Sequence, residues 1–384
     1  MMATRSHPRL EQRSRGFGLV EIMVGVTIGL LALLIVYQVL NLSEGYRRTT
    51  MAGGDAQSSG MISSFVLAGD IANGGHTIAE GAAPLAACGS TGNFATTWRP
   101  IPVLITDGGA DDISVSFAIF GGVNRRLVSP LDLFAAALPG GNVQVQSPLG
   151  FHGSHANEAA HMFVIGNILT GLCEAVTIGN WGGPIDPLRP RAAGFNAATG
   201  VVTITPAPPI ANAYAQGSSF LLNLGANNRV RKVRYDVAGG VIRRTDLIAG
   251  GAPNPIVSNV ALMTAQYGLD TNNDNVIDTW TNARNAPWRA VDVLVAPVQQ
   301  LRQIRAIRIA TVVRSSQFER AKDAEGRDTE ASVQADFTRT LFDCHGLLPC
   351  SGEMLNVTIP GTAGYRYRVF EQVIPLTNQI WNTT

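Results

Sequence analysis

The sequence carries almost no net charge. Its 384 residues include 29 Lys and Arg against 28 Asp and Glu, and only 15% of all residues are charged. A chain balanced in this way creates no strong field for nucleic acid or for acidic substrates, so neither is predicted as a partner. The 41 glycines suit a loop-rich β protein better than a compact helical one. The length is sufficient for two average domains.

Motifs for catalysis are missing as well. The sequence contains no G-x-S-x-G turn, no phosphate-binding loop and no dinucleotide-binding fingerprint. We therefore expect a chain that is not an enzyme and that uses no organic cofactor.

Cysteine is scarce, and its four positions all follow the long apolar stretch described below. An even number of cysteines in an exported region predicts two disulfides. Spacing alone does not fix their connectivity. The closeness of Cys344 and Cys350 favours that pair, which leaves Cys88 for Cys173.

Two short clusters have the composition of metal sites but not the spacing. The segment "CHGLLPC" has one histidine between cysteines that are too far apart for a standard zinc motif, so a disulfide is the better interpretation. The segment "HGSHANEAAH", residues 152–161, lacks the H-E-x-x-H order and is interpreted as chance clustering in a loop.

One apolar stretch dominates the N-terminal region. It runs from Phe17 to Leu40, and residues 1–16 before it are polar and contain several arginines. A stretch of that length can span a bilayer as a helix. No small-residue cleavage site follows it, so we expect it to be retained as an anchor. The arginines predict a cytoplasmic N-terminus and place residues beyond 41 outside the cytoplasm.

The single formal charge within this stretch is Glu21. An acid at the centre of a membrane helix costs about 2.5–3.5 kcal/mol on insertion scales, so its presence needs a reason. An ordinary signal anchor whose glutamate reaches the headgroups is one explanation. The order Gly16, Phe17, then Glu21 as the fifth residue from Phe17, strongly resembles the N-terminus of type IV prepilins and pseudopilins. Gly18 departs from the serine or threonine common there.

That resemblance implies that a prepilin peptidase cuts after Gly16 and methylates the new amine of Phe17. Residues 1–16 would then be the leader and residues 17–40 the transmembrane and assembly helix. Beside a neighbouring subunit, Glu21 would neutralise the charged amine of Phe17 in apolar surroundings. Because a buried charge without a partner is strongly unfavourable, such a pair would fix the axial stagger between subunits.

The helix is expected to continue over residues 41–72 and to end at Asn73-Gly74-Gly75. Ile62, Phe65, Val66 and Gly69 recur at helical spacing, which predicts that they pack on the globular head. Glycine weakens a helix by about 1 kcal/mol relative to alanine, so a break or kink is expected near Gly53–Gly54.

The remaining residues, 73–384, are predicted to form a β-rich head outside the cytoplasm. Apolar–polar alternation indicates strands, and Ala238-Gly239-Gly240 predicts a hairpin turn. Residues 179–194 are rich in Gly and Pro and are expected to form a long loop. The polar residues 315–337 are expected to form a mobile loop with a helical turn. The strand segments are "DDISVSFAIF", "HMFVIGNIL", "VVTITPA", "SSFLLNLG", "RVRKVRYDV", "GVIRRTDLI", "LMTAQYGLD", "IRAIRIATVVRSS" and "YRYRVFEQVIPLT".

The segment "YGLDTNNDNVIDTW" has the oxygen spacing of a calcium loop. Side chains at loop positions 1, 3, 5 and 9 and a backbone carbonyl at position 7 could supply the six to eight oxygens that calcium prefers. Asn275 stands where glycine is usual, and Thr281 where a bidentate glutamate is usual, so weak binding is expected. A polar turn without metal is the alternative. The candidate ligands are Asp270, Asn272, Asp274, Val276 and Asp278.

Beyond the anchor, the order of several segments resembles the PilW-type minor pilins of type IV pilus systems. A "DDISVSF" strand is followed by the acidic loop, by "IRAIRIATVVRS" and by a closing "YRVFEQVIPLTN". The resemblance implies an α+β, pilin-like fold, in which a long N-terminal helix packs on a mainly antiparallel β-sheet head with large insertions.

The same resemblance implies a structural role in initiating or capping a type IV pilus, in support of adhesion or twitching motility. The implied partners are other minor pilins, the major pilin, the prepilin peptidase, the assembly platform and a tip adhesin. Before assembly the chain would lie in the bacterial inner membrane with a periplasmic head, and afterwards in the surface pilus. A type II secretion pseudopilin remains an alternative, and a membrane-anchored binding or hydrolytic ectodomain a remote one.

Overall fold

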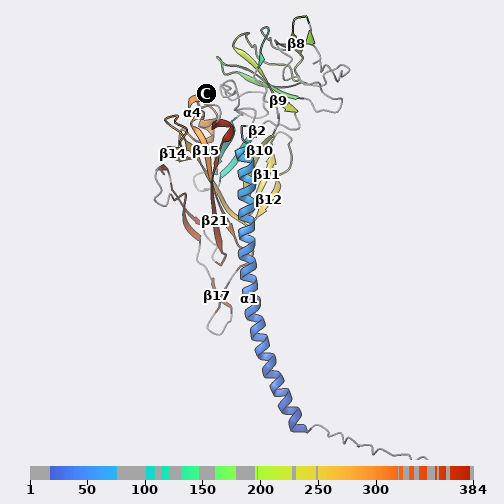
Figure 1. The fold of residues 1–384 in the computed structure, drawn as a ribbon, viewed down its shortest axis with the longest axis vertical. Coiled ribbons are helices and arrows are strands. Elements are labelled where there is room, and N and C mark those ends of the chain that lie inside the picture. Colours follow the sequence, from blue (N-terminus) through green and yellow to red (C-terminus); the bar gives the residue numbers. More distant parts are fainter. Residues whose placement is uncertain are drawn as a thin grey trace, which may run out of the picture. The chain divides into compact units, whose positions relative to one another are not determined.

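The computed structural model describes most of the head and the N-terminal helix (Figure 1). The described residues are 18–75, 101–108, 115–121, 131–146, 161–178, 195–196, 198–226, 231–247, 250–318, 320–322, 328–332, 337–343, 351–352, 354–359 and 364–380.

The chain divides into two compact units, residues 1–53 and 54–384. Helix α1 (Leu19–Ala72) contributes to both, and it runs through Gly53 and Gly54 without interruption. No break occurs there, so that part of the prediction is wrong, and the kink stays a prediction. Helix propagation is cooperative, so two glycines do not end a helix of this length. The helix does end where predicted, because Gly75 has a φ of 78° and the Asn73 side chain donates to the carbonyl of Gly69.

Two five-stranded sheets form the body of the second unit. The first has the order β1-β2-β10-β11-β12 and is antiparallel throughout. The second has the order β19-β14-β13-β15-β21 and is antiparallel except for the short β14–β19 pair. The strands of the first are β1 (Val103–Asp107), β2 (Val115–Gly121), β10 (Arg231–Ala238), β11 (Val241–Asp246) and β12 (Asn254–Ser258). Those of the second are β13 (Val260–Leu269), β14 (Thr279–Asn282), β15 (Ile304–Arg314), β19 (Ser351–Gly352) and β21 (Tyr367–Pro375).

The main hydrophobic core lies where both sheets meet the second half of α1. Leu67 and Ile71 of the helix, Tyr235 of β10, and Tyr267 and Ile307 of the second sheet are all fully buried there. The short helices α3 (Ala290–Val293) and α4 (Val298–Arg302) contribute further apolar side chains to this core, and α5 (Thr377–Ile380) follows β21. The fold is therefore α+β, with a long N-terminal helix and an antiparallel β-rich body, as the sequence predicts.

Two further strand pairs form separate two-stranded sheets. Strands β18 (Phe337–Leu341) and β20 (Leu355–Ile359) pack on the face of β15 that carries Ala310 and Val312. Strands β16 (Arg320–Lys322) and β17 (Asp328–Ser332) pair with each other. Strands therefore form in part of the segment 315–337, where a loop with a helical turn is expected, and residues 319, 323–327 and 333–336 lie outside the described residues. Polar residues fill both hairpin strands, so apolar alternation could not reveal them.

Residues 122–230 form an insertion within a hairpin. Strands β2 and β10 pair directly, with Gly121 opposite Arg231, although the whole insertion lies between them in sequence. The insertion contains one sheet of order β3-β9-β5-β6 and one of order β4-β8-β7. Its core, which includes Phe163, Val202 and Tyr214, shares no residue with the main core. The strands are β3 (Leu131–Asp132), β4 (Val143–Val145), β5 (His161–Asn167), β6 (Cys173–Ile178), β7 (Phe195–Asn196), β8 (Val201–Ile204) and β9 (Ser219–Ala226).

Strands form in each segment whose alternation predicts one. The predicted turn joins β10 to β11, and both of its glycines adopt left-handed φ values, 58° at Gly239 and 75° at Gly240. Segment 304–314 is a strand from its first residue, with α4 ending just before it. The predicted long loop at residues 179–194 lies outside the described residues.

Candidate functional sites

The N-terminal signal is described only from Gly18 onward, so the predicted processing site at Gly16 and Phe17 lies outside the described residues. Glu21 lies in the first turn of α1, where a negative charge interacts favourably with the helix dipole. Residues Leu19–Asn41 are long and apolar enough to cross a membrane. Their apolar side chains are exposed along the whole segment, as an anchor requires.

The second half of α1 docks on the head through small residues. Ala56, Gly60, Ser63, Leu67 and Ile71 are buried at spacings of three and four, which is one helix face. At Gly60 the ring of Phe370 lies so close that an added Cβ would be only 1.9 Å from a ring carbon.

Hydrogen bonds hold this part of α1 in place along its length. Gln372 of β21 donates to the Ser64 carbonyl over 3.0 Å, and Thr377 donates to the Ala72 carbonyl over 2.9 Å. At the helix end the Tyr235 hydroxyl donates to Oδ2 of Asp70 over 2.5 Å. The same oxygen lies 3.5 Å from Nε of Arg244. Within the second unit the helix is thus an integral part of the head.

The predicted packing face of this helix is largely wrong. Phe65 is 81% exposed and Ile62 is 47% exposed, and Gly69 is exposed too; Val66 alone of that set packs against the core. The helix turns its small residues inward because they let the bulky Phe370 approach closely. Apolar Met61, Ile62 and Phe65 then form a ridge on the outer side, which we call the α1 ridge.

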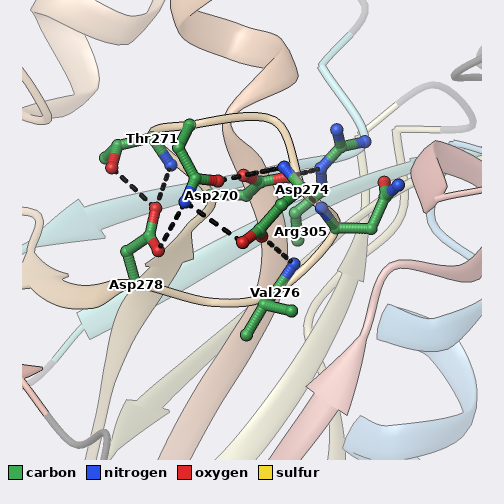
Figure 2. A network of polar contacts seen from close by, with 8 residues as sticks. Asp270, Thr271, Asp274, Val276, Asp278 and Arg305 are labelled. Carbon is green, nitrogen blue, oxygen red and sulfur yellow. Dashed lines mark hydrogen bonds and ion pairs between the residues drawn. The ribbon is translucent and has the colours of Figure 1, made fainter.

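The acidic loop between β13 and β14 is closed by its own hydrogen bonds (Figure 2). Asp270, 0% exposed, accepts backbone N–H bonds from Asp274 and Asn275 over 3.2 and 3.0 Å. Asp274 in turn accepts the N–H of Val276 over 2.7 Å. Asn275 has a φ of 67°, the left-handed conformation that the calcium-loop interpretation requires at that position.

The two ends of this loop differ in their partners (Figure 2). Asp270 forms a buried ion pair with Arg305 of β15, with 3.1 Å between Nε and Oδ2. At the other end the backbone and hydroxyl of Thr271 donate to Asp278, and the hydroxyl bond is the main reason that the pKa of Asp278 lies below its usual value. Asn272 donates to both Asp274 and Asp278 over 3.1 and 3.4 Å.

The loop therefore gathers the predicted calcium ligands in one segment, but it uses their oxygens in hydrogen bonds. Among the residues that the structure describes, no group of three His, Cys, Asp or Glu side chains is arranged to hold a metal ion. Sequence reasoning did not find Arg305, because its contact with Asp270 depends on how β13 and β15 pair. Calcium binding here stays a prediction.

Of the four cysteines only Cys173 is described. It is buried at the start of β6 and is disulfide-bonded. Cys88, Cys344 and Cys350 lie outside the described residues, so the predicted pairing stays a prediction. Of the histidine cluster, only His161 is described, as the first residue of β5.

Comparison with known families gives one match in the head and one at the N-terminus. Residues 236–378, from β10 to β21, match PilW, the Type IV Pilus-assembly protein W family. Residues 12–37 match the Prokaryotic N-terminal methylation motif, which includes Gly16, Phe17 and Glu21. No curated protein and no solved structure matches the chain significantly. The two matches support a PilW-type, prepilin-like protein, a pilin related to the type IV pilus.

Proposed function

We propose that this pilin is a minor pilin that helps to initiate or cap a type IV pilus at its tip, together with other minor pilins. It would be held in the inner membrane by residues 19–41 with its head in the periplasm, and would then pass into the surface pilus. The observation that carries the proposal is the insertion at residues 122–230, which lies outside both matched segments.

The insertion leaves the head at the end where α1 finishes. Gly74, just after the helix, lies against the carbonyl of Pro102 and the side chain of Val103. Val103 pairs with Ile119 of β2, which ends two residues later at Gly121. The chain enters this unit at Gly54, so the insertion begins beside the far end of the part of α1 that belongs to this unit.

This position suits the terminal subunit of a filament. Head-to-tail contacts that do not close into a ring build an open helical filament, in which every internal subunit has neighbours on both sides. A terminal subunit has one end without a neighbour. A folded module at the end of the head where α1 finishes would have to fit between subunits throughout a shaft, whereas at the tip it meets no such constraint.

The α1 ridge supports incorporation into an assembly. Phe65 is 81% exposed and Met61 is 55% exposed on a helix that is otherwise firmly docked. Exposed apolar groups that lie together are typical of surfaces that contact another protein. The ridge belongs to the same helix as the apolar anchor, so subunit contacts made by the anchor can continue along it.

The proposal is tested by replacing Glu21 with alanine. We expect Glu21→Ala to leave removal of the leader intact, and to reduce the amount of this chain in sheared pili and the number of pili. The matched control is Glu44→Ala, which removes an acid from the same helix beyond the apolar segment and should leave both unchanged. Normal pilus numbers and normal incorporation in Glu21→Ala would contradict the proposal.

A gene deletion separates the pilus from a type II secretion system, whose pseudopilins share this N-terminus. Loss of surface pili with normal secretion of enzymes is the expected result, and the reverse result would assign the chain to secretion. Mass spectrometry of the N-terminus supplies a further check, because processing predicts a chain that begins at methylated Phe17.

A further inference from the structure

The insertion has an unusual surface at one end of its larger sheet. Three loops meet there: residues 133–142 after β3, residues 168–172 between β5 and β6, and residues 205–218 before β9. We call them the apolar loop cluster. Strand β9 returns to β10 from its Ala226 end, whereas the cluster lies at its Ser219 end. The cluster is therefore at the end of the sheet opposite to this connection with the head.

Backbone hydrogen bonds join the three loops. Ala137 and Tyr214 exchange two N–H···O bonds of 2.9 and 2.8 Å, and Gly140 donates to the Ile210 carbonyl over 2.9 Å. Ile168 donates to the Ser218 carbonyl over 2.9 Å. The loops thus form one continuous surface.

Two buried polar side chains fix the loops from within. Asn167, 6% exposed, accepts the N–H groups of Leu169 and Thr170 over 2.9 and 3.1 Å and donates to the Ser218 hydroxyl. Glu174, 2% exposed, accepts the N–H groups of Ala211 and Asn212, both over 2.7 Å. Such clamps order the loops before any partner arrives, so binding would lose little further conformational entropy.

The surface that these clamps hold is apolar. Leu169 is 83% exposed, in a turn that the Asn167 side chain holds in place. Exposed apolar side chains come from two of the loops, and exposed alanines and prolines line the third. The large ones are Phe134 at 41%, Leu138 at 64%, Ile168 at 51%, Leu169 at 83% and Leu172 at 44% exposure.

The same three loops contain no Lys, Arg, Asp or Glu. This absence limits what can cover the surface. A partner that buried a charged group against it would leave that charge without a counter-ion, at a large desolvation cost. Surfaces that bind anionic lipid headgroups use clustered Lys and Arg, and these loops provide none. The surface that fits is therefore apolar and uncharged.

We propose that the apolar loop cluster docks a second, different protein of the pilus through an apolar and uncharged face. The inference rests on the proposed tip function, because a subunit present once at a tip meets other components and not its own copies. Leu169, at the centre of the ordered turn, is the contact that we expect to matter most, with Leu172 beside it.

Photo-crosslinking in intact pili tests this. A benzoylphenylalanine replaces Leu169 in the full chain, pili are sheared from illuminated cells, and adducts are identified by mass spectrometry. We expect an adduct with one pilus protein other than this chain, through a peptide segment without charged residues. Adding Leu172→Asp should lower its yield about tenfold, the effect of weakening one hot-spot contact. Both sites are exposed, so neither change should disturb folding.

Two controls accompany the experiment. The same crosslinker at Met354, 59% exposed on the head, should not give this adduct. Val295→Asp, at a side chain that is 72% exposed elsewhere, should leave the Leu169 adduct unchanged.

Every other outcome overturns the inference. The inference is wrong if the crosslinker at Leu169 gives adducts with lipid only or with a second copy of this chain only. It is also wrong if chains recovered with the pili show no adduct from Leu169, or if Leu172→Asp does not reduce the adduct. Absence of the wild-type chain from pili, read by immunoblot, would instead refute the proposed function, and the inference with it.

Discussion

At the scale of single residues, Arg305 has a role that its place in an apolar strand hides. Its side chain and that of Asp270 are 4% and 0% exposed, and their charges face each other over 3.1 Å. Removing Arg305 would leave a buried carboxylate without its cation, which typically costs about 3–5 kcal/mol. We therefore expect Arg305→Ala to lower the free energy of unfolding of the head by that amount, measured by urea denaturation.

The exposed pair Arg289–Asp292 is the control for this prediction. Its Nε and Oδ2 atoms are only 2.6 Å apart, but the arginine is 52% exposed. Exposed ion pairs contribute little because water screens them. Arg289→Ala should leave the unfolding curve nearly unchanged, and a loss equal to that of Arg305→Ala would show that burial is not the cause.

Lys232 on β10 gives a pH-dependent prediction. Burial lowers its pKa to about 8, from about 10.4 in an unfolded chain. Between these values the unfolded chain binds more protons, so stability should rise with pH from about 8 to 10, and the cost of burial is fully present below pH 8. Lys232→Met should add on the order of 1 kcal/mol at pH 7, after allowance for partial exposure, and should remove the contribution of this residue to that rise.

Urea titrations of both proteins at pH 7 and pH 10 provide the measurement. Other groups titrate in this range, so the difference between variant and wild type is the relevant quantity. An equal difference at the two pH values would contradict the assignment.

Single-residue predictions succeeded where the chemistry is local in sequence. The left-handed conformation of Asn275 and the glycine turn at Gly239–Gly240 follow from what those residues permit. The partner of Asp270 could not be found in this way, because β13 and β15 bring Arg305 to it from 35 positions away. Which charges meet depends on strand register, which the residues themselves do not display.

At the scale of elements, the packing of α1 on β21 can be tested by replacing glycine with alanine at two positions of the helix. A Cβ at Gly60 would lie 1.9 Å from the ring of Phe370, whereas nothing lies within 4 Å of a Cβ at Gly69. Alanine favours a helix over glycine by about 1 kcal/mol. Gly69→Ala should therefore stabilise the head by up to that amount, and Gly60→Ala should destabilise it by about 1–3 kcal/mol through overpacking.

Thermal unfolding of the two variants decides this. If both glycine substitutions raised the melting temperature, the close contact between α1 and β21 would be refuted.

The outer side of the same helix shows why its orientation was mispredicted. Apolar periodicity identifies a face, but Phe65 and Ile62 mark the exposed one. The buried face is recognisable by its small residues, Ala56, Gly60 and Ser63. For a helix that packs on its own head and is proposed to contact other subunits as well, hydrophobicity marks two surfaces, and the spacing rule cannot say which is intramolecular.

Calcium binding by the loop between β13 and β14 is a further prediction at the scale of elements. Because Arg305 already neutralises Asp270, the exposed carboxylate of Asp274 and the half-buried carboxylate of Asp278 would provide most of the attraction. We expect calorimetry to give a weak calcium-dependent heat with the wild-type head and none with Asp274→Ala. If the wild-type head gives no heat, hydrogen bonds and Arg305 alone maintain this loop.

At the scale of the whole molecule, the insertion has a hydrophobic core separate from the main core, and the sequence does not predict this separation. No linker composition marks residues 122 or 230, so the sequence was interpreted as one head over residues 73–384. The boundary becomes visible only from the pairing of β2 with β10 across the insertion. Local sequence patterns predict nine of the strands and miss the others, such as β1, β6 and β12, and the pairing of all of them depends on contacts between distant segments.

This separation predicts that the insertion can be removed. Gly121 and Arg231 already pair, so a short Asn-Gly turn could join β2 to β10 in place of residues 122–230. The main core loses no buried residue in this deletion, because its members all lie outside the insertion. We expect the shortened head to fold, with an unchanged unfolding midpoint for the main core.

Scanning calorimetry of the full and shortened heads measures this directly. A head whose insertion has a core of its own is expected to depart from two-state unfolding, and the deletion should remove the transition of the insertion while keeping that of the main core. A matched deletion of residues 254–258 removes β12, which contributes Val257 to the main core, and should abolish the remaining transition. If the shortened head failed to fold while the full head unfolded in a single step, the insertion would be an integral part of the main core. A folded shortened head would also permit a sharp assignment of function, because it keeps the anchor, Glu21 and the α1 ridge and lacks the whole insertion, the apolar loop cluster included. Pilus incorporation without pilus initiation in that variant is the result expected of a tip subunit.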